Sequence, residues 1–208
     1  MLVTVATFAV AAALLVILPG PDTLVFLRSL VRDGRGAALR TLAGTLTGLA
    51  IWVAVAVLGL TAVLRASHDA YLALRVVGAA YLVWMGFQAL RPARRAALAA
   101  AAAGDRPRGR ASLSGGFVAG LATDLLNPKV GVFFVTFLPT FIAVGQPVAA
   151  TSLLLGAVYI LETAIYFVVL LCASATVTRW MSTQRIRTWI DRAMGAVFIG
   201  FGIRLVLE

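Results

Sequence analysis

The sequence predicts an all-α polytopic membrane protein with six transmembrane helices, and three observations support this prediction. Hydrophobic residues make up 62% of the 208 residues and charged residues only 12%, about half the charged share of an ordinary soluble domain. A protein of 21.8 kDa has too little interior to hide that much apolar surface, so much of it must face lipid. The apolar residues also lie in runs of about 20, the length that crosses a hydrocarbon core.

The first three runs occupy the N-terminal half of the chain. The first extends from residue 2 to about residue 27. Four residues that interrupt a helix break it: Pro19, Gly20, Pro21 and Asp22. The second run, 41–64, carries no charge, and the third, about 70–90, holds Arg75 in its first turns. Each is long enough to cross a bilayer.

The other three runs occupy the C-terminal half. The fourth, about 113–143, contains a second set of polar and helix-breaking residues: Asp124, Asn127, Pro128 and Lys129. The fifth, about 148–175, carries Glu162. The sixth, 188–207, is the weakest, because arginines near its two ends leave only 11 residues between them. If the sixth run does not span, the protein has five spans.

A basic, Ala-rich segment of low complexity divides the chain into two halves, 1–90 and 113–208, with a linker at 91–112. A short internal echo supports the division, since residues 75–82 resemble residues 192–199. Three spans in each half would make the two repeats inverted in the membrane. The first span of each half is overlong and broken at proline, and paired broken helices of this kind indicate the binding site of a transporter.

Basic residues predict the orientation. The segments after spans one, three and five hold 14 arginines and the opposite face holds three, so the positive-inside rule puts those segments in the cytoplasm and both termini outside. We therefore interpret the net charge of +10 as a signal for membrane orientation. The predicted partner is the lipid bilayer and not nucleic acid. The single Cys172 and single His68 provide no metal site, no nucleophilic triad and no cofactor site, so no enzyme is expected.

Four ionisable residues lie within the predicted spans: Asp22, Asp124, Lys129 and Glu162. Each such group costs roughly 2.5 to 3.5 kcal/mol near a helix centre, so together they cost about 10 to 14 kcal/mol unless they pair, protonate or face water. Asp22 and Asn127 have a structural alternative, because each stands where a half-helix restarts and is able to cap it. Asn127 and Pro128 form a favourable pair of N-cap and first helical residue.

Lys129 needs an anion nearby, because a cation in the first turn of a helix opposes the helix dipole. Asp22 is the expected partner across the two breaks, and Asp124 is the alternative on its own span. An ion pair that only holds the helices together is the structural alternative. Glu162 is either a proton carrier, because a carboxyl group removed from water favours its uncharged form, or a neutral, hydrogen-bonded structural group.

Two motifs of small residues, Gly44 to Gly48 and Gly116 to Gly120, have the GxxxG spacing of close helix packing. They serve either packing within one bundle or a homodimer, and the sequence leaves both open.

The motifs resemble those of the lysine exporter (LysE) superfamily, most closely the homoserine/threonine exporter (RhtB) branch. Three segments carry the resemblance: Leu18-Pro-Gly-Pro-Asp22, Gly78-Ala-Ala-Tyr-Leu82, and Leu126-Asn-Pro-Lys-Val130 followed by Phe137-Leu-Pro139. The likeness extends in order and spacing over nearly the whole chain. It implies a multi-pass protein of the bacterial inner membrane that exports amino acids or similar small metabolites by proton antiport.

The resemblance carries over onto the residues of the two breaks, while Asp124 and Glu162 rest on the physical argument alone. We expect the substrate carboxylate at the restarting helix ends and Lys129, and its ammonium at Asp22, Asp124 or Glu162. Asp22 and Glu162 are the candidates for proton coupling. The alternatives are a divalent-cation exporter, suggested by the three intramembrane acids, and a membrane scaffold that transports nothing.

Overall fold

The computed structural model describes residues 2–66, 68–90, 115–143, 145–173 and parts of 189–203, and its regular secondary structure there is all helical. The helices are α1 (Leu2–Ile17), α2 (Pro21–Asp33), α3 (Arg35–Ala66), α4 (His68–Leu90), α6 (Gly115–Leu125), α7 (Pro128–Val132) and α8 (Val148–Cys172). A π-helical segment, η1 (Phe133–Phe137), and a 3-10 segment, η2 (Leu138–Phe141), continue α7. The fold class is therefore confirmed as all-α.

The breaks in the first and fourth spans are confirmed. The helices α1 and α2 meet at an angle of 52°, and the pair α6 and α7 to η2 at 47°. Residues 35–59 and 148–172 are long and apolar enough to cross a membrane, and the described chain offers four such spans when each bent pair counts as one. The sixth predicted span lies largely outside the described residues, as does the linker 91–112.

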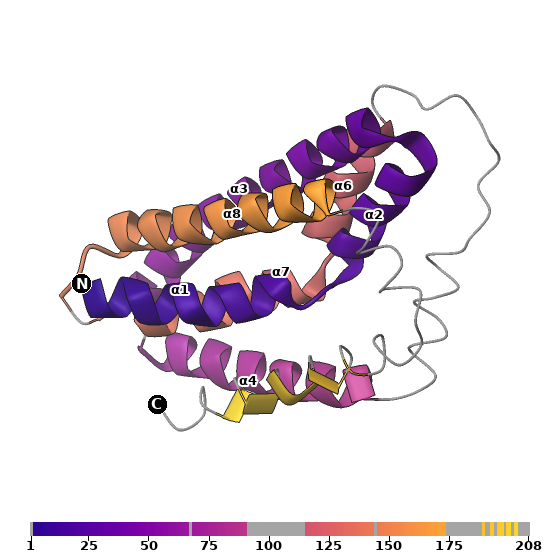
Figure 1. Ribbon diagram of the computed structural model, residues 1–208. Coiled ribbons are helices and arrows are strands. Elements are labelled where there is room, and N and C mark those ends of the chain that lie inside the picture. Colours follow the sequence, from indigo (N-terminus) through magenta and orange to yellow (C-terminus); the bar gives the residue numbers. More distant parts are fainter. Residues whose placement is uncertain are drawn as a thin grey trace.

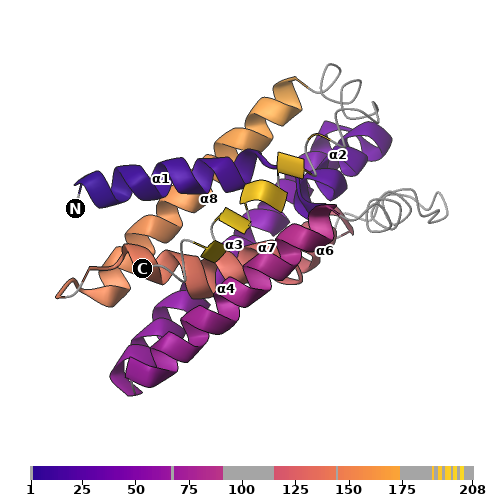
Figure 2. The ribbon, with the colours of Figure 1, turned by 90° about the horizontal axis from the view of Figure 1, so that it is seen from below.

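The ends of the helices fall into two groups, which Figure 1 and the turned view in Figure 2 both show. One end of the bundle carries the junction of α2 with α3, the last turn of α4, the start of α6 and the last turn of α8. The opposite end carries the N-terminus, the junction of α3 with α4 and the start of α8. The segments predicted to lie together in the cytoplasm thus leave from one end of the bundle.

The helices α3 and α6 cross closely, and glycines make the crossing possible. A Cβ atom on Gly44 would lie 2.0 Å from the carbonyl oxygen of Phe117, and one on Gly120 would lie 2.1 Å from that of Thr41. A Cβ on Gly116 would lie 2.9 Å from the carbonyl oxygen of Ala37. Both small-residue motifs therefore pack one helix on the other within this chain, and a homodimer remains a prediction.

A second close contact joins α4 to the described helical residues near the C-terminus. A Cβ on Gly86 would lie 2.8 Å from the carbonyl oxygen of Gly195, and one on Gly202 would lie 2.9 Å from that of Ala79. The third span therefore lies beside the C-terminal segment (Figure 2).

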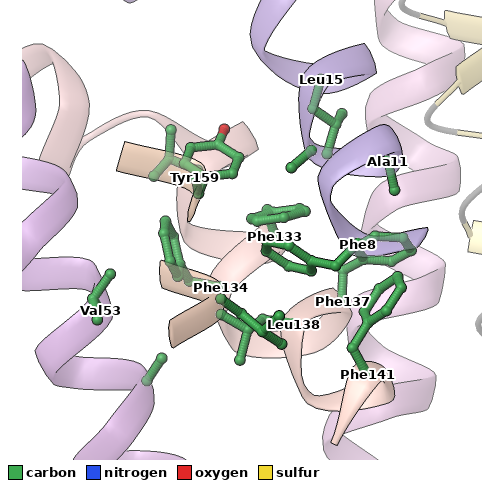
Figure 3. Packing of buried hydrophobic residues seen from close by; sticks show 14 of the residues in the cluster. Phe8, Ala11, Leu15, Val53, Phe133, Phe134, Phe137, Leu138, Phe141 and Tyr159 are labelled. Atoms are coloured by element: carbon green, nitrogen blue, oxygen red, sulfur yellow. The ribbon is translucent and has the colours of Figure 1, made fainter. Parts of the chain in front are cut away.

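The main core is aromatic and lies between α1, α8 and the π-helical segment (Figure 3). Phe133 is fully buried and its ring centroid lies 4.6 Å from that of Tyr159 on α8 and 5.7 Å from that of Phe8 on α1. Phe141 packs edge-on against Phe8, with 5.2 Å between centroids. This core holds in place α1, which precedes the first break, and α7, which follows the second.

Candidate functional site

The candidate site lies where the two helix breaks meet. The first break leaves residues 18–20 outside any helix, and the second leaves Asn127 between α6 and α7. Proline stands in the first turn of both restarting helices, where its missing N–H is not needed. A Cβ atom on Gly20 would lie 3.7 Å from Lys129 Nζ and 3.8 Å from Asn127 Nδ2. Residues more than 100 positions apart in the chain are therefore neighbours here.

Asn127 connects the two breaks through both ends of its side-chain amide. Its Oδ1 accepts a hydrogen bond of 3.1 Å from the main-chain N–H of Lys129, which confirms the predicted N-cap of α7. Its Nδ2 donates a hydrogen bond to Asp22 Oδ2. Asn127 is 2% exposed; its bond from Lys129 is buried and its bond to Asp22 is partly buried. The capping role and a role in the site therefore coexist in one residue.

Lys129 is 7% exposed, and its side chain reaches back to the end of α1. Its Nζ donates hydrogen bonds to the main-chain carbonyls of Leu15, at 2.6 Å, and Leu18, at 3.0 Å. The last carbonyls of a helix have no partner within it and carry the negative end of its dipole. A cation here both donates hydrogen bonds to these carbonyls and interacts favourably with the dipole.

These bonds change the expected pairing of Lys129. We expected a carboxylate, first Asp22 and otherwise Asp124, as its direct partner. Its described hydrogen bonds go instead to two carbonyls, because the end of α1 supplies the negative potential. Both carboxylates still act on Lys129 electrostatically.

Asp22 lies in the first turn of α2 but does not cap it. The N-cap residue is Gly20, so Asp22 is not the N-cap of α2. The carboxylate still faces the positive end of the α2 dipole, which favours an anion. Its Oδ2 takes the bond from Asn127, while its buried Oδ1 has no hydrogen-bond partner.

Asp124 lies one turn before the second break and is 1% exposed. Neither of its carboxyl oxygens has a hydrogen-bond partner. Its side chain lies against α3, where a Cβ on Gly48 would be 2.5 Å from Oδ2. Trp52 donates its indole N–H to the main-chain carbonyl of Asp124 at 3.4 Å. This bond does not involve the carboxyl group of Asp124, which stays without a partner.

Glu162 lies apart from this cluster, on α8. Its side chain is half-buried, and Oε2 is buried without a hydrogen-bond partner. Tyr159, one turn earlier, is the residue that sequence reasoning missed. It is 2% exposed, and its phenol lies within electrostatic range of Asp22, Asp124 and Glu162. Figure 3 shows its hydroxyl at the edge of the aromatic cluster, pointing away from the ring of Phe133.

The cluster of Asp22, Asn127 and Lys129 provides a cation, an anion and a neutral amide within one small volume. An ammonium has three N–H donors, and the carbonyls of α1 occupy two of those of Lys129. Asp22 Oδ1 has a free acceptor position. Such a set is able to recognise a small molecule that carries both an anionic and a cationic group. No group of three or more metal-binding side chains forms within the part of the chain that the structure describes.

Comparison with known proteins places this site in context. Residues 13–208 match the model of the family described as "LysE type translocator". The chain is 32% identical to a threonine efflux protein of Escherichia coli strain K12 over 210 aligned positions, with all of both chains covered. It is 29% identical to a leucine efflux protein of Enterobacter sp. strain 638, covering 96% of this chain and 93% of the relative. It is 28% identical to a homoserine/homoserine lactone efflux protein of Salmonella typhi, covering 95% and 93%. No solved structure matches.

Proposed function

Because this chain belongs to the LysE type translocator family, whose members are transporters and not enzymes, we propose that it exports an amino acid in exchange for protons. The membrane would be the bacterial inner membrane, crossed by two inverted three-span repeats. The observation that carries the proposal is the hydrogen-bonded contact between the two helix breaks, formed by Asp22, Asn127 and Lys129.

The substrate class follows from the charges of this cluster. An amino acid has a carboxylate and an ammonium on neighbouring atoms. The carboxylate would take the remaining N–H of Lys129, and the ammonium would take the unpartnered Oδ1 of Asp22. Named relatives that export threonine, leucine and homoserine support a substrate recognised by its α-amino acid group, with the side chain setting selectivity.

The broken helices would also provide the moving parts. Rocking of one repeat against the other would expose the site to each side of the membrane in turn. Moving one proton inward across the membrane potential is worth about 2.3 kcal/mol per 100 mV, so a single proton per substrate supplies a useful driving force. The excess of arginines in the sequence segments after spans one, three and five supports a cytoplasmic position for those segments and an external position for both termini.

Counterflow in proteoliposomes tests this function. Vesicles loaded with unlabelled threonine, leucine, homoserine or lysine should take up the same labelled amino acid, and vesicles without protein or loaded with a divalent cation should not. Lys129→Met and Asp22→Asn should each lower this uptake roughly tenfold to 100-fold, because hydrogen bonds to charged groups contribute about 1.5 to 3 kcal/mol.

Asp33→Asn is the matched control for Asp22→Asn, since Asp33 lies at the far, exposed end of the same helix. It should transport like the wild type. Normal counterflow in both site variants, at equal abundance in the membrane, would contradict the proposed site. No counterflow of any amino acid by the wild type would contradict the function.

A further inference from the structure

We propose that Asp124 carries the proton that drives export and does not bind the substrate ammonium. The proposal rests on the proposed antiport and names the residue that performs it. The observation behind it is the close enclosure of an unpaired carboxyl group at the crossing of α3 and α6.

The enclosure leaves no room for an ammonium group on the α3 side of Asp124. A single carbon atom added to Gly48 would lie 2.5 Å from Oδ2, 2.9 Å from Cβ and 3.0 Å from Cγ of Asp124. These separations are well below the 3.4 to 4 Å of ordinary contact. A proton needs no such space, because it adds to an oxygen that is already present.

The carboxyl group also lacks the donors that would stabilise a negative charge. Both oxygens are buried without a hydrogen bond, whereas Asp22 Oδ2 receives one from Asn127. Burying an ionised carboxylate without partners costs several kcal/mol, and the uncharged acid avoids most of that cost. In this conformation the proton therefore belongs on Asp124 rather than on Asp22.

The charged groups around Asp124 support the same assignment. Lys129 on α7 attracts a negative charge at Asp124, and Asp22 on α2 repels one. The nearest charged residue before Gly48 on α3 is Arg40, eight residues away or about 12 Å along the helix axis. Two carboxyl groups therefore share one ammonium, whose described hydrogen bonds go to the end of α1. When two carboxyl groups share one site, the second ionises with difficulty.

Loss of the proton would give Asp124 a reason to compete for Lys129. An ionised Asp124 attracts the ammonium that now binds the carbonyls of Leu15 and Leu18. Removing Lys129 from these carbonyls would release α7 from the end of α1. The proton on Asp124 would thus set whether the two breaks are bound together, which is the coupling that an antiporter needs.

Asp124→Asn tests the assignment, with Asp33→Asn as the matched control, because each change removes ionisation and retains shape. Both are measured in proteoliposomes in two modes: counterflow of labelled threonine, leucine, homoserine or lysine without a pH gradient, and net transport driven by an imposed gradient. We expect Asp124→Asn to retain counterflow within about twofold and to lose the response to the gradient. Asp33→Asn should retain both.

A gradient response in Asp124→Asn equal to that of the wild type would overturn the assignment. So would loss of the response in Glu162→Gln alone, and so would loss of counterflow in Asp124→Asn at normal abundance. Asp124→Ala is a second variant, and a pH-sensitive dye inside the vesicles is a second measurement. In both variants of Asp124 we expect proton movement across the membrane to disappear during transport. A wild type that exchanges amino acids without any response to the gradient would refute the antiport itself.

Discussion

The close crossing of α3 and α6 makes a quantitative prediction for Gly120→Ala. The added methyl carbon would lie 2.1 Å from the carbonyl oxygen of Thr41, 2.9 Å from its carbonyl carbon and 3.0 Å from the main-chain nitrogen of Thr45. All three atoms belong to the backbone of α3, so no side chain is able to rotate away. Reaching even 3.4 Å from the oxygen requires a local separation of 3.4 − 2.1 = 1.3 Å.

This separation sets the size of the effect. Overpacking a close-packed interior costs about 1 to 3 kcal/mol, and a clash between two backbones belongs at the upper end of that range. Alanine also gains roughly 1 kcal/mol over glycine in a helix. The control Gly59→Ala has the same gain but no clash, because nothing lies within 4 Å of its Cβ position on α3. The two variants should therefore differ in free energy of unfolding by about 3 kcal/mol.

Thermal unfolding in detergent micelles measures this difference. A chain of this length shifts its Tm by roughly 2 to 4 °C per kcal/mol, so Gly120→Ala should unfold about 6 to 12 °C below Gly59→Ala. Transport should fall as well, since Asp124 lies one turn after Gly120 on α6. Equal Tm values for the two variants would show that α3 and α6 do not meet in this way.

Two other predictions concern the second break and the orientation. Asn127→Ala removes the cap of α7, worth about 1 kcal/mol, and leaves Asp22 Oδ2 without its donor, at a cost of about 1 to 3 kcal/mol. Its Tm in micelles should therefore fall by at least 4 °C at roughly 2 to 4 °C per kcal/mol, and an unchanged Tm would contradict the observed bonds. In a cysteine-free background, an impermeant maleimide added to intact cells should label Ala143→Cys and not Asp33→Cys. Labelling of Asp33→Cys and not Ala143→Cys would show that the membrane orientation of every loop is opposite to the prediction.

Much of the fold could be predicted because each span is a local property of the sequence. Apolar run length and helix breakers placed both bends, and Pro21 and Pro128 begin the restarting helices as expected. The start of α3 could not be predicted from hydropathy, because Arg35 and Arg40 interrupt the apolar pattern while the helix continues through both. The π-helical turn over residues 133–137 has no local signal, since its five residues are equally compatible with an ordinary helix.

The residues that meet at the two breaks could be picked out from the sequence, but their contacts could not. Asp22 and Asn127 are 105 residues apart, and Lys129 is 114 residues from the carbonyl it binds, so no local pattern records these pairs. The bond from Lys129 to α1 did have a physical signal. A helix that ends at proline inside a membrane leaves carbonyls that need donors. The position of Tyr159 within electrostatic range of the carboxyl groups has no such signal, because a tyrosine in an apolar run is equally suited to a core.

The two breaks are stable only because each supplies what the other lacks. A helix interrupted at membrane depth exposes carbonyls at one end and N–H groups at the other, and both need partners where water is scarce. Here Lys129 serves the carbonyls of α1, and Asn127 serves both the start of α7 and the carboxylate of Asp22. Under the proposed mechanism, separating the repeats would remove these partners. In that mechanism an amino acid would then offer its carboxylate as an acceptor to Lys129 and its ammonium as a donor to Asp22. Under the proposal, a molecule with only one of these two groups would leave either Lys129 or Asp22 without a partner, so the atoms that join the two breaks would also set the choice of substrate.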